Sequence, residues 1–291
     1  MYANIFAQSK GSAIADESLL RHMIVNSLRK IKEKFGNDYG RMVLCLDSSN
    51  AWRNEHFEYY KHERKAKRAE SPSEDMAEMF KFIHSIQDEL INFSPYPCIK
   101  VPRAEADDII AILSGEQNRV GGKTLICSND HDFFQLHNDN TEQYLSLKGK
   151  VIRCEDPDQQ LFELIVSGDK SDGIPNVLSD DDTFAVATKR QKPLRKGTAA
   201  QIIDDICKTE SLMEQSGTVT KQIQRNWDRN ERLIDLKCIP QDIRENILAA
   251  YKDATTAKYE NNDRGIDFYK YMLSADMKIM ADNTQSLMIG E

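Results

Sequence analysis

The sequence predicts an α/β domain in which helices cover both faces of a mostly parallel central sheet, followed by a smaller helical domain. Three short apolar runs have the composition of buried strands: RMVLCLD at 41–47, CIKV at 98–101 and TLIC at 124–127. Helical patterns separate these runs, and this alternation is typical of a parallel sheet. After about residue 160 the pattern becomes helical and polar, so we expect domains at 1–166 and 167–291.

The helices of the first domain are predicted from apolar residues at helical spacing. SLLRHMIVNSLRKIKEKF at 18–35 precedes the first strand, and MAEMFKFIHSIQDELINF at 76–93 precedes the second. A third helix follows the acidic stretch PRAEADD at 102–108. After about residue 160, the segments LFELIVSGDKSDGIPNV, TAAQIIDDICKTESL and RNWDRNERLIDL predict helices joined by turns.

Length and composition limit the class of protein. The chain has 291 residues, is 40% hydrophobic and carries a net charge of −8, so it can bury a large core. The acidic total argues against indiscriminate nucleic-acid binding but leaves room for a local basic surface. The sequence shows no transmembrane stretch and no signal-peptide pattern, and its six cysteines form no CxxC pair. These features predict a cytoplasmic protein with free thiols and no membrane partner.

Acidic residues follow each predicted strand directly. Because the carboxyl ends of parallel strands share one edge of a sheet, acids that are far apart in sequence would converge there. A fourth acidic group stands in GDKSDG, where two aspartates lie three positions apart and face one way if the turn is helical. The candidate metal ligands are Asp47, Glu105, Asp107, Asp108, Asp130, Asp132, Asp169 and Asp172.

So many carboxylates in one cleft would repel one another. Two like charges about 5 Å apart repel by roughly 3 kcal/mol at an effective dielectric constant of about 20. Arg103 is the only adjacent base in the sequence, which is too little to neutralise them. Divalent cations would resolve the conflict, and a site made only of oxygen atoms selects Mg²⁺ or Mn²⁺.

Each acidic group also has an ordinary structural interpretation. Asp47 and the acids at 105–108 could begin a helix, and the other two pairs could form turns. An EF-hand is excluded because the loop glycine and the distal glutamate are absent. A phosphatase-like strand–DxD motif is weak because Phe133 stands where a small hydroxyl residue is expected. Four acidic groups in this order are more specific than any one of them.

Two basic stretches complement the acids. YKHERKAKR at 60–68 and TKRQKPLRKGT at 188–198 could contact a phosphate backbone, and Tyr60 could stack on a base. Either stretch could instead be a solvated charged surface, which is the commoner case. Their basic residues are Lys61, Arg64, Lys65, Lys67 and Arg68 in the first, and Lys189, Arg190, Lys192, Arg195 and Lys196 in the second.

These motifs together resemble a known family, the structure-specific 5′-nucleases, which includes flap endonucleases and the 5′-exonuclease domains of bacterial DNA polymerases. AEADDIIA, SNDHDFFQL and GDKSDGIPNV are similar to three successive acidic motifs of that family. YKHER resembles the YKxxR element of its helical arch, which we expect at about 52–75. RKGTAAQII resembles part of its helix–three-turn–helix duplex-binding motif, although the usual GxGxKTA is incomplete here.

The resemblance implies a PIN-like 5′-nuclease core and a Mg²⁺-dependent 5′–3′ exonuclease or flap endonuclease with ribonuclease H activity. Such a phosphodiesterase uses two Mg²⁺ ions, for which Mn²⁺ substitutes, and in a phage-like replication system it would remove RNA primers from lagging-strand fragments. The carried-over metal ligands are the eight acids above, with Asp169 and Asp172 holding the second ion. Lys61 and Arg64 would act on the scissile phosphate as catalytic residues. The implied nucleic-acid contacts are Arg53, Tyr60, Lys65, Lys67, Arg68, Lys189, Arg190, Lys192, Arg195, Lys196, Gly197 and Thr198.

The resemblance also implies the partners and shows one departure. A monomer that binds branched or primed DNA and RNA:DNA duplex is expected, with a single-strand-binding protein and a sliding clamp as partners. Family members begin with a strand ending in an aspartate, whereas this chain starts at Met1, just after that place, so we expect the strand upstream. Two alternatives stay open: a non-catalytic, structure-specific DNA-binding protein that lacks this aspartate, and a PIN-type ribonuclease, which has no use for GDKSDGIP.

Overall fold

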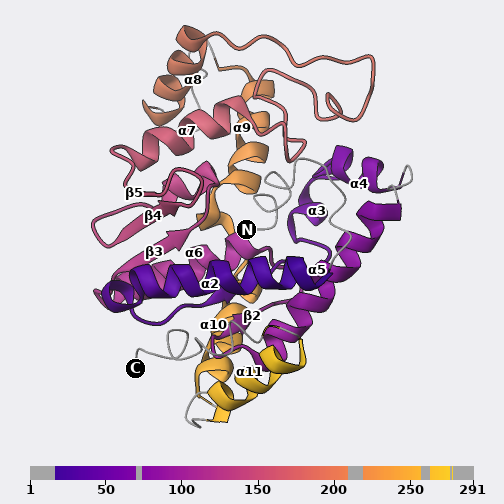
Figure 1. The fold of residues 1–291 in the computed structure, drawn as a ribbon. Coiled ribbons are helices and arrows are strands. Elements are labelled where there is room, and N and C mark those ends of the chain that lie inside the picture. Colours follow the sequence, from indigo (N-terminus) through magenta and orange to yellow (C-terminus); the bar gives the residue numbers. More distant parts are fainter. Residues whose placement is uncertain (1–16, 70–73, 209–218, 257–262, 276, 278–291) are drawn as a thin grey trace.

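The computed structural model describes residues 17–69, 74–208, 219–256, 263–275 and 277, and its α/β architecture confirms the predicted fold class (Figure 1). Among these residues the strands are short. Strands β1 and β2 pair in parallel, β3 and β4 pair in parallel, and β4 pairs with β5 antiparallel. Their bounds are Leu44–Cys45 (β1), Cys98–Ile99 (β2), Thr124–Cys127 (β3), Thr141–Leu145 (β4) and Lys150–Ile152 (β5).

The described strands form two sheets, with orders β1-β2 and β3-β4-β5, rather than the single sheet that we predicted. Strands β1, β2 and β3 lie inside the three predicted apolar runs. Strands β4 and β5 were not predicted, because their sequences, TEQYL and KVI, mix polar with apolar residues. Within the described residues no ladder joins β1 to β3. The expected strand ending in an aspartate concerns sequence before Met1, so it lies outside the described residues and stays a prediction.

Helices cover both faces of the first sheet, because successive strand residues point to opposite sides. Leu44 and Cys98 pack against the apolar cluster formed by α2 and α5. Cys45 and Ile99 face the other way, into the cluster formed by α6 and α10. The bounds of these helices are Glu17–Tyr39 (α2), Glu74–Phe93 (α5), Ala106–Arg119 (α6) and Gln241–Thr256 (α10).

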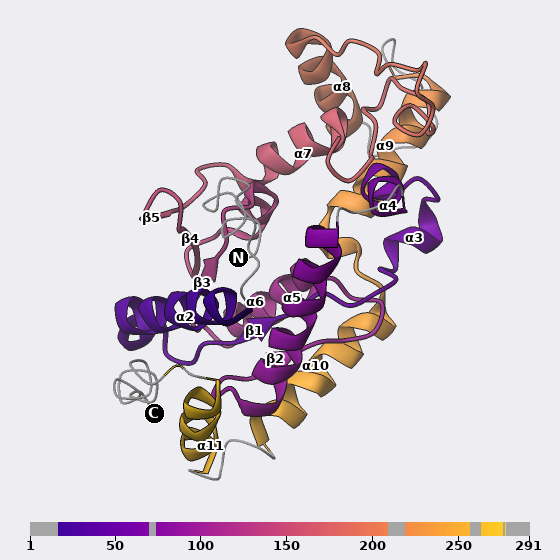
Figure 2. The same cartoon turned by 45° about the vertical axis from the view of Figure 1, so that its right-hand side comes forward.

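Three further helices, α7, α8 and α9, form a separate apolar cluster that stands at the top in both views (Figures 1 and 2). Ile165, Ile202 and Trp227 are at its centre, one from each helix, and each is at most 3% exposed. Helix α7 begins where the Asp156 carboxylate accepts a hydrogen bond from the Gln159 amide at 2.9 Å. The bounds are Pro157–Ser167 (α7), Lys196–Lys208 (α8) and Lys221–Ile234 (α9).

The last two described helices do not follow the predicted domain boundary at 166/167. Ile243 and Ile247 of α10 are fully buried in the cluster around the first sheet. In α11 (Asp263–Ser274), Phe268 and Met272 pack with Val25 and other residues of the first domain. The prediction was wrong for these helices, because α10 and α11 return to complete the α/β core (Figure 2).

The predicted arch at about 52–75 contains two short helices, α3 (Arg53–His56) and α4 (His62–Ala69). Residues 70–73 lie outside the described residues, so an arch-shaped path stays a prediction. In the part of the chain that the structure describes, no helix is long and apolar enough to cross a membrane.

The packing of α11 predicts a specific loss of stability. Phe268→Ala should lower the free energy of unfolding by about 3–5 kcal/mol, because Phe268 is 2% exposed and its loss leaves a cavity in the α/β core. The matched control is Tyr269→Ala on the same helix, whose side chain is 38% exposed and whose loss should cost less than about 1 kcal/mol. Urea denaturation measures both changes, and equal losses would contradict the packing of α11 described above.

Candidate functional site

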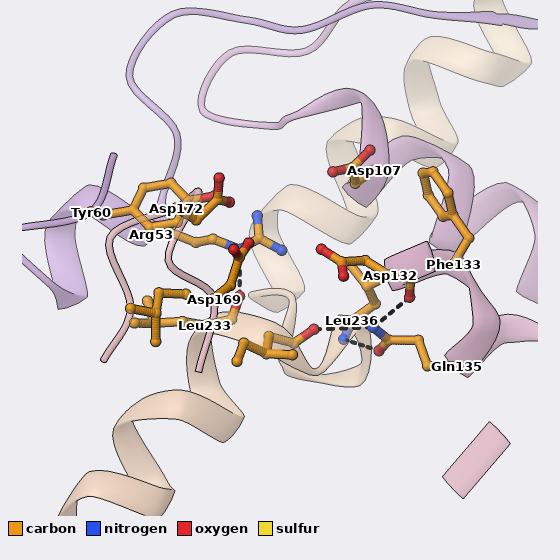
Figure 3. Close-up of a pocket in the computed structure, with 12 residues that line it drawn as sticks. Arg53, Tyr60, Asp107, Asp132, Phe133, Gln135, Asp169, Asp172, Leu233 and Leu236 are labelled. Carbon is orange, nitrogen blue, oxygen red and sulfur yellow. Dashed lines mark hydrogen bonds between the residues drawn. The ribbon is translucent and has the colours of Figure 1, made fainter. Parts of the chain in front are cut away.

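A pocket lined by four aspartates lies where the start of α6, the segment after β3, the loop after α7 and the end of α9 meet (Figure 3). Asp107 comes from the first turn of α6, and Asp132 from the short helix η1 (His131–Leu136) that follows β3. Asp169 and Asp172 come from the loop after α7. Three of the four predicted acidic groups therefore contribute directly to one pocket. The other lining residues are Arg53, Tyr60, Phe133, Gln135, Ile174, Leu233, Ile234 and Leu236.

Two more of the predicted acids stand close to this pocket. Asp47 is exposed, and its Oδ1 accepts a hydrogen bond at 2.8 Å from the Ala106 amide at the start of α6. Asp130 is exposed, and its Oδ1 accepts from the Asp132 amide at 3.1 Å. The charges of both carboxylates act on Asp107. The acids after β1, β2 and β3 thus converge, as the strand-end rule predicts.

Two of the pocket's aspartates, Asp107 and Asp132, carry negative charge that neighbouring bases leave largely uncompensated. Burial, together with the charges of Asp47 and Asp130, raises the pKa of Asp107 to about 7. Burial and the charges of three neighbouring aspartates likewise raise the pKa of Asp132 to about 7. Within the described residues no ion pair involves Asp107 or Asp132. The pocket therefore favours a bound cation or proton.

The donor set fits a hydrated divalent ion. Among the described residues, no three Asp, Glu, His or Cys side chains are close enough together to bind one metal ion directly. Mg²⁺ tolerates this arrangement, because it keeps several of its waters and commonly binds through only one or two carboxylates. The four carboxylates of the lining offer the oxygen donors that such an ion prefers, and the raised pKa values of Asp107 and Asp132 show that negative charge there is poorly compensated.

Asp108 does not face the pocket. Its side chain is fully buried, accepts hydrogen bonds from the Glu105 amide at 2.9 Å and from Trp52 Nε1 at 3.2 Å, and lies 2.9 Å from Arg53 Nη1. It closes a reciprocal capping box at the start of α6. In this structure the carboxylate of Asp108 is committed to the start of α6, so we leave Asp108 out of the proposed metal ligands.

Glu105 is paired with bases rather than open to the pocket. Its carboxylate contacts Lys61 Nζ at 2.5 Å, the Tyr60 hydroxyl at 2.8 Å and Arg53 Nη1 at 2.9 Å. Burial opposes ionisation of Glu105, but Lys61 and Arg53 outweigh burial and hold its pKa below the ordinary value. Arg103, the only base adjacent to these acids in the sequence, pairs instead with Glu55 and Asp242.

Two of the predicted nucleic-acid contacts are buried instead. Arg53 is 4% exposed, and besides its carboxylate partners it donates from Nε to the Leu233 carbonyl at 2.8 Å. Tyr60 is 2% exposed, and its hydroxyl lies 2.9 Å from Asp172 Oδ2. In this conformation neither side chain is accessible to a nucleic acid, so we leave Arg53 and Tyr60 out of the proposed nucleic-acid contacts. Both residues instead build the wall of the pocket (Figure 3).

Lys61 and Arg64 lie at the border of the pocket through their contacts with Asp172. Arg64 Nη2 is 3.1 Å from Asp172 Oδ1, and Lys61 Nζ is 3.5 Å from Asp172 Oδ2. The Lys61 backbone has φ +53° and donates its N–H to the Asp172 carbonyl at 2.7 Å. At Gly173 (φ +76°), a Cβ would lie 2.8 Å from the Tyr59 carbonyl oxygen, so only glycine permits this approach.

The loop that carries Asp169 and Asp172 is not a helical turn. Helix α7 ends at Gly168, whose φ is +67°, and the Ile174 amide donates to the Asp169 carbonyl at 2.7 Å. Asn230 of α9, which we did not predict, holds this loop by donating to the Pro175 carbonyl at 2.9 Å and to the Ile165 carbonyl at 2.7 Å. Asn226 stands four positions before Asn230 and next to Trp227. This helical spacing could have indicated polar side chains that are buried and paired with carbonyl groups of another segment.

Comparison with known proteins decides the family. Residues 2–170 match the model of the 5′–3′ exonuclease N-terminal resolvase-like domain. The chain belongs to this family. Its predicted resemblance to the 5′-nucleases is confirmed, and these are enzymes that hydrolyse phosphodiester bonds.

Two relatives and two solved structures are similar to this chain over most of its length. Ribonuclease H of Enterobacteria phage T4 is 29% identical over 274 residues, which cover 91% of this chain and 86% of the relative. DNA polymerase I of Rhizobium leguminosarum is 27% identical over 79% of this chain, which spans only 21% of the polymerase. The T5 D15 protein co-crystallised with metal ions has a TM-score of 0.59 at 18% identity, covering 79% of this chain and 92% of that one. The T5 D15 flap endonuclease in complex with DNA and metal ions has a TM-score of 0.57 at 18% identity, covering 80% and 91%. These two structures share the exonuclease fold.

No residue of the second basic stretch lines the aspartate pocket, but Lys189 and Arg190 line a neighbouring cavity together with Lys170 of the loop that carries Asp169 and Asp172. Lys189 is paired with Asp182 at 2.6 Å and with Asp180 at 3.6 Å, and Lys192 Nζ is 3.9 Å from Asp180. The other residues of the stretch, Arg190, Arg195, Lys196 and Gly197, are exposed, and Thr198 is half-buried. In the first stretch, Lys65 is exposed and contacts Asn54, while the side chains of Lys67 and Arg68 lie outside the described residues.

The elevated pKa of Asp132 predicts how stability depends on pH when metal is absent. An aspartate has a pKa of about 4 in the unfolded chain, so between about pH 4 and 7 the folded protein binds more protons, and stability falls as pH rises through that window. Asp132→Asn should therefore raise the free energy of unfolding in EDTA by about 1–3 kcal/mol at pH 8. The gain should shrink as the pH is lowered to about 4.

Urea denaturation at several pH values measures this effect. The control is Asp139→Asn, whose fully exposed carboxylate pairs with Arg153 and should change stability little at any pH. A gain from Asp132→Asn that does not depend on pH would contradict the electrostatic origin.

Proposed function

We propose that this protein is a divalent-metal-dependent 5′ nuclease that acts on branched or primed DNA and on the RNA strand of RNA:DNA duplexes. The observation that carries the proposal is the pocket in which Asp107, Asp132, Asp169 and Asp172 meet beside Lys61 and Arg64. The names of the T4 ribonuclease H and of the DNA-bound T5 flap endonuclease support the choice of substrates. Metal ions in the T5 structures support the cofactor.

The proposed metal ligands are the aspartates that line or border the pocket. Two Mg²⁺ ions, or Mn²⁺ in their place, would supply an activated water and neutralise the charge that develops on the phosphate. Asp107 and Asp132 would give up their protons on binding, since each is only partly ionised near pH 7. The proposed set is Asp47, Asp107, Asp130, Asp132, Asp169 and Asp172, with Glu105 available only if Lys61 releases it.

Lys61 and Arg64 have the position of electrostatic catalysts. Both cations touch Asp172 at the pocket border, so a phosphate held at the pocket would come within their reach. A fixed cation beside the negative charge that develops in the transition state lowers the barrier of the reaction. The Glu105 carboxylate holds Lys61 in place before substrate binds.

The second basic stretch is proposed to bind the duplex away from the cut. Arg190, Arg195 and Lys196 are exposed, and α8 begins at Lys196, so its first amides can contact a phosphate. Lys189 and Lys192 would exchange their aspartate partners for phosphates. Such contacts provide affinity and register without sequence specificity.

The proposed context is removal of RNA primers during phage-like DNA replication, in the cytoplasm of a host cell. The T4 ribonuclease H, which covers nearly the whole chain, supports this context. A monomer with a single-strand-binding protein and a sliding clamp as partners remains part of the proposal. A non-catalytic DNA-binding protein is the second candidate, because no preformed three-ligand metal site exists among the described residues.

Cleavage of 5′-labelled substrates tests the function. A flap duplex and an RNA-primed duplex should both be cut near the 5′ end with Mg²⁺ present and remain intact in EDTA. Asp132→Asn should lower the rate at saturating Mg²⁺ by more than tenfold, because it removes a proposed metal ligand, while affinity for a DNA fork stays within about threefold. Tight fork binding without cleavage by the wild-type protein would establish the non-catalytic alternative.

Lys61 and Arg64 can be tested together. The double change Lys61→Ala with Arg64→Ala should lower kcat by about 100-fold and raise KM by less than about fivefold, because these cations act mainly on the transition state. Lys148→Ala, in the exposed turn between β4 and β5, is the matched loss of positive charge and should leave kcat unchanged. If the double change raised KM and spared kcat, the two residues would be ordinary phosphate contacts.

A further inference from the structure

Two buried polar residues stand behind the turn that carries Asp130 and Asp132. Gln143, on β4, is fully buried, and His137, at the end of η1, is 4% exposed. Neither lines the aspartate pocket, and the proposed chemistry uses neither. Burying such groups costs stability unless every polar atom is paired.

The Gln143 carboxamide holds the backbone of the acidic turn. Its Nε2 donates to the Ser128 carbonyl at 2.8 Å and to the Asp130 carbonyl at 2.7 Å, which uses both of its N–H groups. The opposite orientation of the carboxamide would place its oxygen against two carbonyl oxygens. The orientation of Gln143 is therefore fixed by its contacts.

His137 fixes Gln143 in turn. The Gln143 Oε1 can only accept, so the His137 Nε2 at 3.1 Å must carry the proton and donate. The other ring nitrogen, Nδ1, accepts from the Cys154 amide at 2.8 Å. The ring is thus neutral with one tautomer, and burial, which lowers the pKa of His137, agrees with that state.

These bonds hold the acidic turn at both ends. Asp130 is the residue before η1 and His137 the residue after it, with Asp132 in the first turn between them. The Asp132 amide donates to Asp130 Oδ1, so fixing the Asp130 backbone also fixes the position of Asp132. On the far side, Gln135 ties η1 to the Leu236 amide at 2.9 Å (Figure 3).

We propose that Gln143 and His137 are positioning residues that hold Asp130 and Asp132 in the geometry that binds divalent ions. This inference rests on the proposed function, in which Asp130 and Asp132 are ligands of divalent ions. Carboxylates that repel one another move apart unless the backbone is held. Loss of a residue that orients a metal ligand commonly lowers metal affinity by about 10–100-fold. Gln143 and His137 act on ligand geometry, so binding of nucleic acid should not depend on them.

The test combines metal binding with stability. His137→Leu removes the donor to Gln143 and the acceptor for Cys154, whereas His137→Gln supplies a carboxamide that can replace one or both. Gln143→Met removes both donors to the acidic turn. The control is Thr141→Val, a buried residue on the same strand whose hydroxyl donates to Asn118 at 3.1 Å, away from the acidic turn.

Electron paramagnetic resonance measures the binding of Mn²⁺ alone to each variant. Urea denaturation in EDTA measures the stability of each variant, and a binding assay in EDTA measures its affinity for a DNA fork. His137→Leu and Gln143→Met should weaken Mn²⁺ binding about 10–100-fold, His137→Gln should restore most of the loss, and fork affinity should change by less than threefold. Thr141→Val should lose comparable stability yet bind Mn²⁺ as the wild type does. If Gln143→Met does not fold, the two His137 variants decide the outcome.

Two results would overturn the inference. One is unchanged Mn²⁺ affinity in folded His137→Leu. The other is an equal loss in Thr141→Val, which would show a general effect of destabilisation. Failure of the proposed function is a separate result, because the wild type would then bind Mn²⁺ without cutting either substrate.

Discussion

The buried guanidinium of Arg53 is the interaction on which the arrangement at the start of α6 depends. It lies 2.9 Å from both Glu105 and Asp108 and donates to the Leu233 carbonyl, so it joins α3, α6 and the end of α9. Breaking such a buried pair by removing one partner typically costs about 3–5 kcal/mol, because it leaves an uncompensated charge. Arg53 thereby allows three acids to occupy four successive positions at the entry to a core.

The helix then separates the three acids into different environments. Successive side chains on a helix diverge by about 100°, so Glu105 and Asp108 meet across the capping box while Asp107 points elsewhere. Lys61 and Arg53 hold the pKa of Glu105 low despite its burial, whereas burial and like charges raise that of Asp107 to about 7. Residues 105–108 therefore provide one carboxylate that is paired with bases, Glu105, and one carboxylate for the pocket, Asp107, that pairs with no base among the described residues.

The sequence was most informative where a general rule links position to geometry. The three apolar runs were predicted as strands, and the strand-end rule predicted that Asp47, Asp107, Asp130 and Asp132 converge. It was least informative about burial, because Arg53 and Tyr60 stand in a polar context and only the fold shows them inside. A common orientation of Asp169 and Asp172 was expected if their turn were helical, whereas the helix ends before them, at Gly168, and the loop brings both to the pocket. Gln143 and His137 gave no recognisable signal, since their role depends on strands that were not predicted.

Backbone contacts, more than long side chains, determine where the charges of the pocket lie. Gly173 allows the Tyr59 carbonyl to approach closely, and the Lys61 amide then bonds to the Asp172 carbonyl. Lys61 and Asp172 are thus held near each other by backbone contacts between two loops, at 59–61 and 172–173, that are far apart in sequence. A side chain at Gly173 would separate these loops and move both charges together. The same holds at Asp130, where the Gln143 carboxamide binds the backbone of the acidic turn, so the positions of the pocket's carboxylates follow from contacts that fix the main chain.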